Sequence, residues 1–246
     1  MDPRQQDADR ILIAHVQDLV RRGAWRSFTA FLDMRQYTML QRELQAGTYR
    51  FFGGYEGAQR GLLCIHPMDA EPADDEFPIT CLTYTFPPGF EVTHRDVLGS
   101  LMAQQVQRDT IGDILVAKGR VQCFVTGAAA AVGMSLTRIG RVGVKVTDAL
   151  PVADDYRQET RELAATVSSP RLDAILRNAL RRGRGECVDL IRSGIVMLNY
   201  QECTDPAKLL KPGDVFSVRG FGKFSVKSIG EPTRKDRLPV IIEKYL

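Results

Sequence analysis

The chain has 246 residues and a formal net charge of +3, and 44% of its residues are hydrophobic while 26% are charged. This length predicts two or three modules, and this composition predicts soluble modules with packed cores. No apolar run approaches the length of a membrane-spanning helix, and the polar, acidic start of the chain lacks the pattern of a signal peptide.

The first third of the chain is predicted to contain helices followed by two strands. Apolar residues recur at helical spacing over residues 8–45, with a break at Gly23. The segment TYRFFGGYEGAQRGLLCIHP, residues 48–67, is typical of two strands around a glycine-rich turn. Its Phe52 or Tyr55 would be able to stack on a nucleic-acid base, but we favour a place in the protein core.

The middle of the chain is predicted to fold in the order β-α-β-β-α-β, which is that of a ferredoxin-like, or RRM-like, sandwich. Strands are expected over 79–86, over 111–126 as a pair about Lys118–Gly119, and over 141–149, with helices over 93–108 and 127–139. The triplet His94-Arg95-Asp96 matches a kinase catalytic-loop motif, but the chain has no DFG sequence or glycine-rich strand loop to accompany it. Thr93 and Asp96 have the spacing of a helix capping box, which is the interpretation we favour.

Basic charge is concentrated towards the C-terminus. From Ser168 onward the chain holds 15 Lys and Arg against 9 Asp and Glu, whereas the first 167 residues hold 18 against 21. A local excess of this kind is the charge footprint of a nucleic-acid-binding module, although a solvated basic surface would have the same composition.

The basic segment is predicted to follow a linking helix over 151–168 and to fold as two short helices and a strand over 171–199. Ser168 to Pro170 have helix-start chemistry, and the sequence RRGRG is predicted to end the first helix because glycine favours a turn. This arrangement places arginines along one helix-turn-helix edge, where their planar guanidinium groups suit phosphate. The predicted RNA-binding residues are Arg171, Arg177, Arg181, Arg182, Arg184, Arg192, Asn199, Arg219 and Lys223.

Residues 171–220 resemble the S-four (alpha-L) RNA-binding domain. The resemblance rests on the opening Arg-Leu-Asp, an arginine in the turn between the helices, Ile-Arg-x-Gly, a strand ending in Asn199, and Pro-Gly-Asp. Further segments, among them FLDMRQ, FFGGYEGAQR, THRDVLGSLM and RIGRVGVKV, are similar to the YlmH-like proteins of bacteria and plastids.

The resemblance implies an α+β, multi-domain chain. The expected parts are a small N-terminal α/β region over 1–75, a central RRM-like domain over 76–150, the linking helix over 151–168, and the S-four domain over 169–246. It also implies RNA binding without catalysis, with rRNA or tRNA and the large ribosomal subunit as partners, in the quality control of stalled translation.

The remaining expectations concern chemistry and location. Five scattered cysteines with no CxxC pair predict reduced thiols in a cytoplasmic protein, and three isolated histidines predict no bound metal. We expect a monomer with no cofactor, no catalytic residue, no small-molecule substrate and no membrane partner. Two alternatives stay open, namely an RNA-modifying enzyme with an appended S-four domain and a protein-interaction scaffold whose basic edge is incidental.

Overall fold

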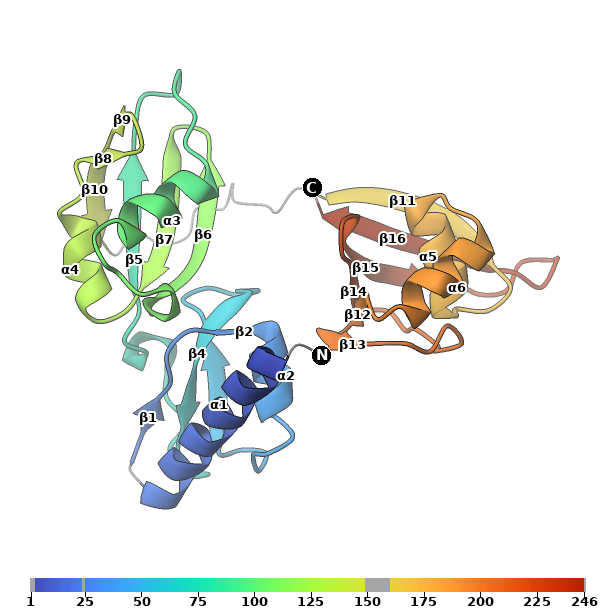
Figure 1. Ribbon diagram of the computed structural model, residues 1–246, viewed down its shortest axis with the longest axis horizontal. Coiled ribbons are helices and arrows are strands. Elements are labelled where there is room, and N and C mark those ends of the chain that lie inside the picture. The colour runs from blue at the N-terminus through green and yellow to red at the C-terminus, as the bar shows by residue number, and fades with distance from the viewer. Residues whose placement is uncertain (1–2, 24, 149–159, 246) are drawn as a thin grey trace. The chain divides into compact units, whose positions relative to one another are not determined.

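A computed structural model describes residues 3–23, 25–148 and 160–245 of the chain. The chain divides into two compact units, Met1–Tyr156 and Arg157–Leu246, and each mixes helices with strands (Figure 1). Within the described residues, no helix is both long enough and apolar enough to cross a membrane.

The first unit begins with a small sheet covered by a long helix. Its elements are α1 (Pro3–Arg22), β1 (Ser27–Phe28), β2 (Leu32–Asp33), α2 (Met34–Leu40), β3 (Tyr49–Phe52) and β4 (Arg60–Ile65). Strand β4 is central and pairs antiparallel with the other three strands. The side chain of Val16 on α1 packs against Leu63 and Ile65 of β4, so the apolar face of the helix closes this part of the core.

The two strands predicted around the glycine-rich turn are confirmed as β3 and β4, whereas the helix predicted through residues 27–44 is too long. Its first part is extended, because Thr29 accepts a hydrogen bond from the amide of Leu63 and holds the chain against β4. Helix α2 starts only after Asp33, whose carboxylate accepts from the amide of Gln36 at 2.8 Å in a capping box.

The rest of the first unit is a four-stranded antiparallel sheet with two helices on one face. Its elements are η1 (Asp74–Glu76), β5 (Thr80–Thr85), α3 (His94–Met102), η2 (Arg108–Thr110), β6 (Ile111–Ala117), β7 (Arg120–Val125), α4 (Ala128–Met134), β8 (Arg138–Ile139), β9 (Val142–Gly143) and β10 (Lys145–Asp148). In the sheet the strand order is β10-β5-β7-β6. Along the chain the helices and strands come in the predicted order, with a β8–β9 hairpin added before β10. The Thr93–Asp96 capping box of α3 is confirmed.

The opposite face of this sheet is covered by the N-terminal part of the same unit. The ring of Phe124 on β7 is 1% exposed and stacks on Tyr55 with ring centroids 5.0 Å apart. Tyr55 also donates to Asp113 of β6, and Phe31 packs against the same face. Gly54 is required here, because a Cβ at that position would lie 2.4 Å from the Phe124 ring. Phe52 and Tyr55 are therefore partly buried and pack against the core, as favoured from the sequence.

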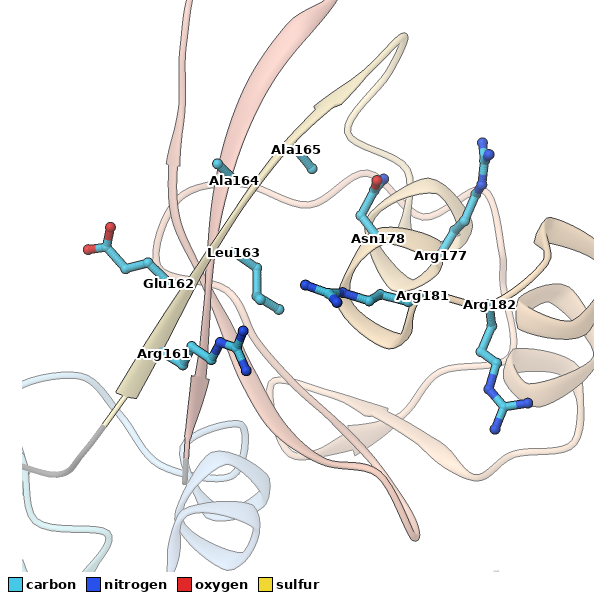
Figure 2. Close-up of a pocket in the computed structure, with 9 residues that line it drawn as sticks. All are labelled: Arg161, Glu162, Leu163, Ala164, Ala165, Arg177, Asn178, Arg181 and Arg182. Carbon is cyan, nitrogen blue, oxygen red and sulfur yellow. The ribbon is translucent and has the colours of Figure 1, made fainter.

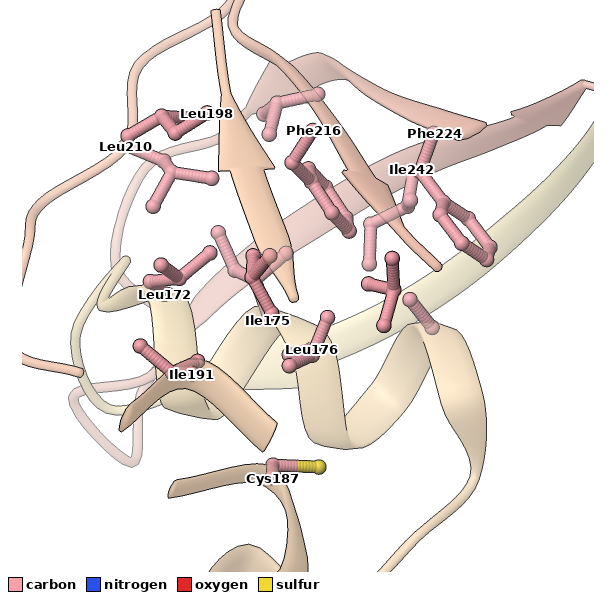
Figure 3. Close-up of a cluster of buried hydrophobic side chains, with 14 of the residues drawn as sticks. Leu172, Ile175, Leu176, Cys187, Ile191, Leu198, Leu210, Phe216, Phe224 and Ile242 are labelled. Carbon is pink, nitrogen blue, oxygen red and sulfur yellow. The ribbon is translucent and has the colours of Figure 1, made fainter. Parts of the chain in front are cut away.

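The second unit is a six-stranded antiparallel sheet with two helices on one face (Figure 1). Its elements are β11 (Thr160–Val167), α5 (Leu172–Leu180), α6 (Arg184–Arg192), β12 (Val196–Leu198), β13 (Gln201–Glu202), β14 (Val215–Val218), β15 (Gly222–Ile229) and β16 (Leu238–Tyr245). The strand order is β11-β16-β15-β14-β12-β13. Leu172, Ile175 and Leu176 of α5 pack on Phe216 and Phe224, whose rings stack at 5.2 Å (Figure 3).

The predicted linking helix over 151–168 is wrong for the part that the structure describes. Residues 160–167 form β11, which pairs with β16 from Thr160 opposite Tyr245 to Val167 opposite Leu238. Leu163 and Val167 face the core at the two-residue period of a strand, and this burial decides against a helix. Residues 151–159 lie outside the described residues.

The ends of α5 also differ from the prediction. The helix starts after Arg171 without a side-chain cap, and its amides at Leu172 and Asp173 donate instead to the carbonyls of Lys208 and Pro206, at 2.8 and 3.1 Å. At the other end the left-handed residue is Arg181, with φ of 54°, and not a glycine. Carbonyls of the loop after β13 therefore accept from the first amides of the helix. The hydroxyl groups of Ser168 and Ser169 had been predicted as the acceptors.

Candidate nucleic-acid interface

Four arginines surround an open hollow between strand β11 and helix α5 (Figure 2). Arg177 lies on α5, Arg181 and Arg182 lie in the turn that follows it, and Arg161 lies on β11. Among the residues that the structure describes, the lining is Arg161, Glu162, Leu163, Ala164, Ala165, Arg177, Asn178, Arg181 and Arg182. Of these described residues four carry a guanidinium group and one a carboxylate, so this part of the lining has an excess of positive charge.

Two further hollows continue this surface. Arg177 is shared with a neighbouring hollow that also contains Arg171, Arg184 and Arg237. Arg171 and Arg184 in turn belong to a hollow that Arg192 completes. Because neighbouring hollows share side chains, they form one continuous basic surface on the second unit. We call it the arginine surface, and its members are Arg161, Arg171, Arg177, Arg181, Arg182, Arg184, Arg192 and Arg237.

A buried carboxylate fixes two members of this surface. Asp173 is 1% exposed, and its oxygens accept from Nε and Nη2 of Arg171 at 3.1 and 3.0 Å. Arg184, which begins α6, donates to the same carboxylate from Nε and Nη2 at 3.2 and 3.0 Å. Asp173 therefore ties the start of α5 to the start of α6 and holds two guanidinium groups side by side. Their remaining N–H groups stay at the surface, because the two side chains are 36% and 62% exposed.

The Asp173 carboxylate is ionised despite its burial. Burial is the largest single effect and raises its pKa, but the hydrogen bonds and charges of Arg171 and Arg184 together lower the pKa below its ordinary value. The unfolded chain therefore takes up this proton at a higher pH than the folded chain does. The stability that the ionised group contributes is present above an unfolded pKa of about 4 and is lost as the pH falls through the lower folded value.

Replacing Asp173 by Asn is expected to destabilise the second unit by about 1–2 kcal/mol at neutral pH, because two charge-assisted pairs are lost while both arginines keep access to water. Urea denaturation followed by circular dichroism measures this change. The variant should also lose part of the stability decrease that the unaltered protein shows as the pH falls below about 4. Asp189→Asn, an exposed carboxylate in the same hollow, is the matched control and should change stability by less than about 0.5 kcal/mol. An Asp173 variant as stable as this control would contradict the conclusion that Asp173 stabilises the unit by tying the start of α5 to the start of α6.

The other arginines differ in what they already contact. Arg182 pairs with Glu186 at 3.0 Å and lies 5.8 Å from the centre of the Phe221 ring. Arg161, Arg177 and Arg181 are exposed, and none of them forms an ion pair with a carboxylate among the residues that the structure describes. Their guanidinium groups are therefore the ones most open to a ligand.

The structure brings six of the nine predicted residues together and places the other three elsewhere. Asn199 has a structural role, since its amide donates to Asp214 and its carbonyl oxygen accepts from the amide of Val215, both at 2.9 Å. The ammonium of Lys223 lies over the rings of Tyr200 and Tyr245. Arg219 is exposed beyond the end of β14. These three residues lie outside the hollows that make up the arginine surface.

Sequence reasoning missed Arg161, Arg237 and the role of Asp173. The sequence spacing could have indicated the position of Arg161. Arg161 and Leu163 are two residues apart, so in a strand they would share a side, as they do in Figure 2. Arg237 follows a loop and reaches the surface by donating to the carbonyl of Thr166 at 2.7 Å. Its place depends on the pairing of β11 with β16, which the helical interpretation of 151–168 excluded.

Comparison with known proteins gives matches in both units of the chain. A family described as "Putative RNA-binding domain in YlmH" matches residues 72–152, and one described as "S4 domain" matches residues 170–216. The chain is 31% identical over 228 residues to ribosome-associated protein quality control protein P2 of Bacillus subtilis, which covers 88% of this chain and 86% of that protein. Among solved structures, cell division protein ylmH from Streptococcus pneumoniae aligns with 21% identity and a TM-score of 0.47, covering 61% of this chain and 93% of that one.

The RNA-binding domain matched in the first unit and the S-four domain matched in the second define an RNA-binding protein. The extent and identity of the match to the Bacillus subtilis protein are high enough to show the family. The chain belongs to the YlmH-like proteins, which carry a C-terminal S-four domain.

Proposed function

We propose that this protein binds structured RNA without catalysing a reaction, and that the arginine surface contacts the phosphate backbone. The observation that carries the proposal is the gathering of eight arginines from β11, α5, α6 and the β15–β16 loop into one continuous surface. Arginine donates from a rigid planar fork that fits phosphate oxygens, and paired guanidinium groups held by Asp173 are already oriented for them.

The RNA partner is an rRNA or a tRNA on the large ribosomal subunit, and the role is the quality control of stalled translation. The name of the Bacillus subtilis relative supports this assignment, since it is a ribosome-associated quality control protein. The S-four and YlmH domains support RNA as the ligand. In this proposal the protein acts in the cytoplasm as a monomer, with no cofactor.

The domain organisation that goes with this function has a ferredoxin-like, or RRM-like, domain over 76–150, following a small module over 1–75. The antiparallel order β10-β5-β7-β6 and the helices α3 and α4 on one face support the assignment. The RNA-binding domain includes β11 and so begins before residue 169, because β11 is an integral strand of its sheet.

The experiment that tests the proposal is ultraviolet crosslinking in cells, followed by sequencing of the RNA attached to the protein. Reads from large-subunit rRNA together with tRNA are expected. Reads confined to mRNA, or recovery no greater than from an untagged strain, would overturn it. In vitro, about 3–5 phosphate contacts predict that log K falls with log salt concentration at a slope of roughly −2 to −4.5. If the binding constant did not change with salt concentration, phosphate contacts by the arginines would not explain the binding.

A further inference from the structure

The central sheet of the first unit does not offer the surface that RRM-like domains commonly use for RNA. Such domains stack unpaired bases on aromatic side chains of the open sheet face. Here Thr83, Leu115, Gln122 and Phe124 are 0–3% exposed, and Tyr55 from the N-terminal part covers the Phe124 ring. The face that could read bases is closed by the protein's own chain, so an RNA contact by this unit has to use another surface.

An open hollow lies on the helical side of the same unit, between α3 and the β8–β9 hairpin. Arg95 in the first turn of α3 and Arg138 on β8 stand on its two sides. The described residues that line it are Arg95, Asp96, Gly99, Ser100, Ala103, Gln104, Leu136, Arg138 and Gly140. The hairpin is fixed to the helix because the amide of Gly140 donates to the Ser100 hydroxyl at 3.2 Å, at a turn where Gly140 has φ of +56°. The spacing of the two arginines is therefore set by ordered elements.

The charge of this hollow fits an anion. Arg95, Arg138 and the hairpin residue Arg141 are exposed, and none of them forms an ion pair with a carboxylate of a described residue. Asp96 is the one carboxylate among the described lining residues, and it is already engaged, since it accepts from the amide and the hydroxyl of Thr93 at 2.9 and 2.6 Å. The Ser100 hydroxyl and the Gln104 amide add polar groups next to the guanidinium groups.

We propose that the hollow between α3 and the β8–β9 hairpin binds phosphate groups of RNA and is a second RNA contact, separate from the arginine surface. Charge complementarity and the closed sheet face both point to RNA backbone as the occupant. The family match names RNA for residues 72–152 without assigning residues to it. The inference rests on the proposed function, because it requires that the full chain binds RNA. It assigns an additional RNA contact to the first unit, through side chains that are not part of the arginine surface.

The test compares full-length variants for binding of unfractionated tRNA and of a labelled mixed-sequence RNA hairpin over a range of salt concentrations. Arg95→Ala with Arg138→Ala is expected to weaken binding about tenfold and to reduce the magnitude of the salt slope by about 2, one unit for each lost phosphate contact. The control is Arg10→Ala with Arg21→Ala, which removes two exposed arginines of α1 from the same unit. For this control the affinity should stay within about twofold of the unaltered protein, and the salt slope should change by less than about 0.5.

The outcomes separate this inference from the proposed function. If the Arg95/Arg138 variant binds like the control while loss of Arg161, Arg177 and Arg181 abolishes binding, the second contact is wrong and the proposed function stands. If neither set changes RNA binding, both are wrong. Thermal melting of each variant checks the fold, which is expected to be intact because Arg95 and Arg138 are exposed.

A measurement on the unaltered protein gives independent evidence. A dicarbonyl reagent modifies free guanidinium groups, and mass spectrometry locates the products. RNA is expected to protect Arg95 and Arg138 at least about fivefold relative to Arg10, since a bound phosphate covers the guanidinium N–H groups. Equal modification with and without RNA would overturn the proposal. So would protection by poly-L-glutamate but not by RNA, because that result would assign the hollow to an acidic protein.

Discussion

Replacing Arg161, Arg177 and Arg181 together by alanine is expected to weaken RNA binding about 100-fold. These three residues line one hollow and lack an ion-pair partner among the described residues. A phosphate therefore replaces only water at their guanidinium groups, and each contact contributes about 1 kcal/mol, so that the three give about two factors of ten. The magnitude of the salt slope should fall by about 3.

The matched control removes the same charge from the same unit. Lys211, Arg234 and Lys235 are exposed and lie outside the hollows of the arginine surface. Their joint replacement by alanine should weaken RNA binding less than about fivefold, because only the general field of the unit is reduced. Fluorescence anisotropy with a labelled tRNA measures both variants. Equal losses for the two triple variants would show that net charge, and not the hollow, accounts for binding.

Phe124→Ala is expected to destabilise the first unit by about 3–4 kcal/mol. The Phe124 ring is 1% exposed, stacks on Tyr55 and belongs to the cluster that joins the central sheet to the N-terminal part. Truncation removes the buried ring and leaves a cavity, and cavities of this kind cost energy because the surroundings relax only partly. The N-terminal part that covers this face of the sheet would lose its contact with the Phe124 ring.

Hydrogen exchange resolved by peptide measures this loss in each unit separately. Peptides from β3, β4 and β7 should exchange faster in the Phe124 variant, while peptides from β14–β16 in the second unit serve as an internal control and should stay unchanged. Phe90→Ala, at a phenylalanine that is 55% exposed, should change stability by less than about 0.5 kcal/mol. An effect of Phe124→Ala below about 1 kcal/mol would mean that the sheet face is less tightly closed than the structure shows.

Local pattern was enough to predict many of the elements. The alternation in ILVAKGRVQCFVT and the turn at Lys118–Gly119 predicted β6 and β7, and the Thr93–Asp96 spacing predicted the capping box of α3. The apolar residues of α5 recur at helical spacing and are buried, as expected. These features depend on neighbours within a few residues, which is why the sequence carries them.

The candidate site shows what local pattern leaves out. Six clustered arginines were identified from a contiguous segment, because α5, α6 and their short turn fix the positions of those residues. Arg161 and Arg237 join them only through the pairing of β11 with β16. Asp173 belongs to the Arg-Leu-Asp motif at the start of the S-four resemblance, but its burial between two arginines depends on how α5 packs against α6.

The sequence by itself therefore determined that the chain ends in a basic S-four module and that its middle has the order β-α-β-β-α-β. Only the tertiary structure decided which basic side chains share a surface and that the N-terminal part covers one face of the central sheet. The physical reason is that residues far apart in the chain pair strands and cover sheets. Tyr55 stacks on Phe124, and β11 pairs with β16. A local pattern gives the face that a side chain occupies, but not the element that packs against it.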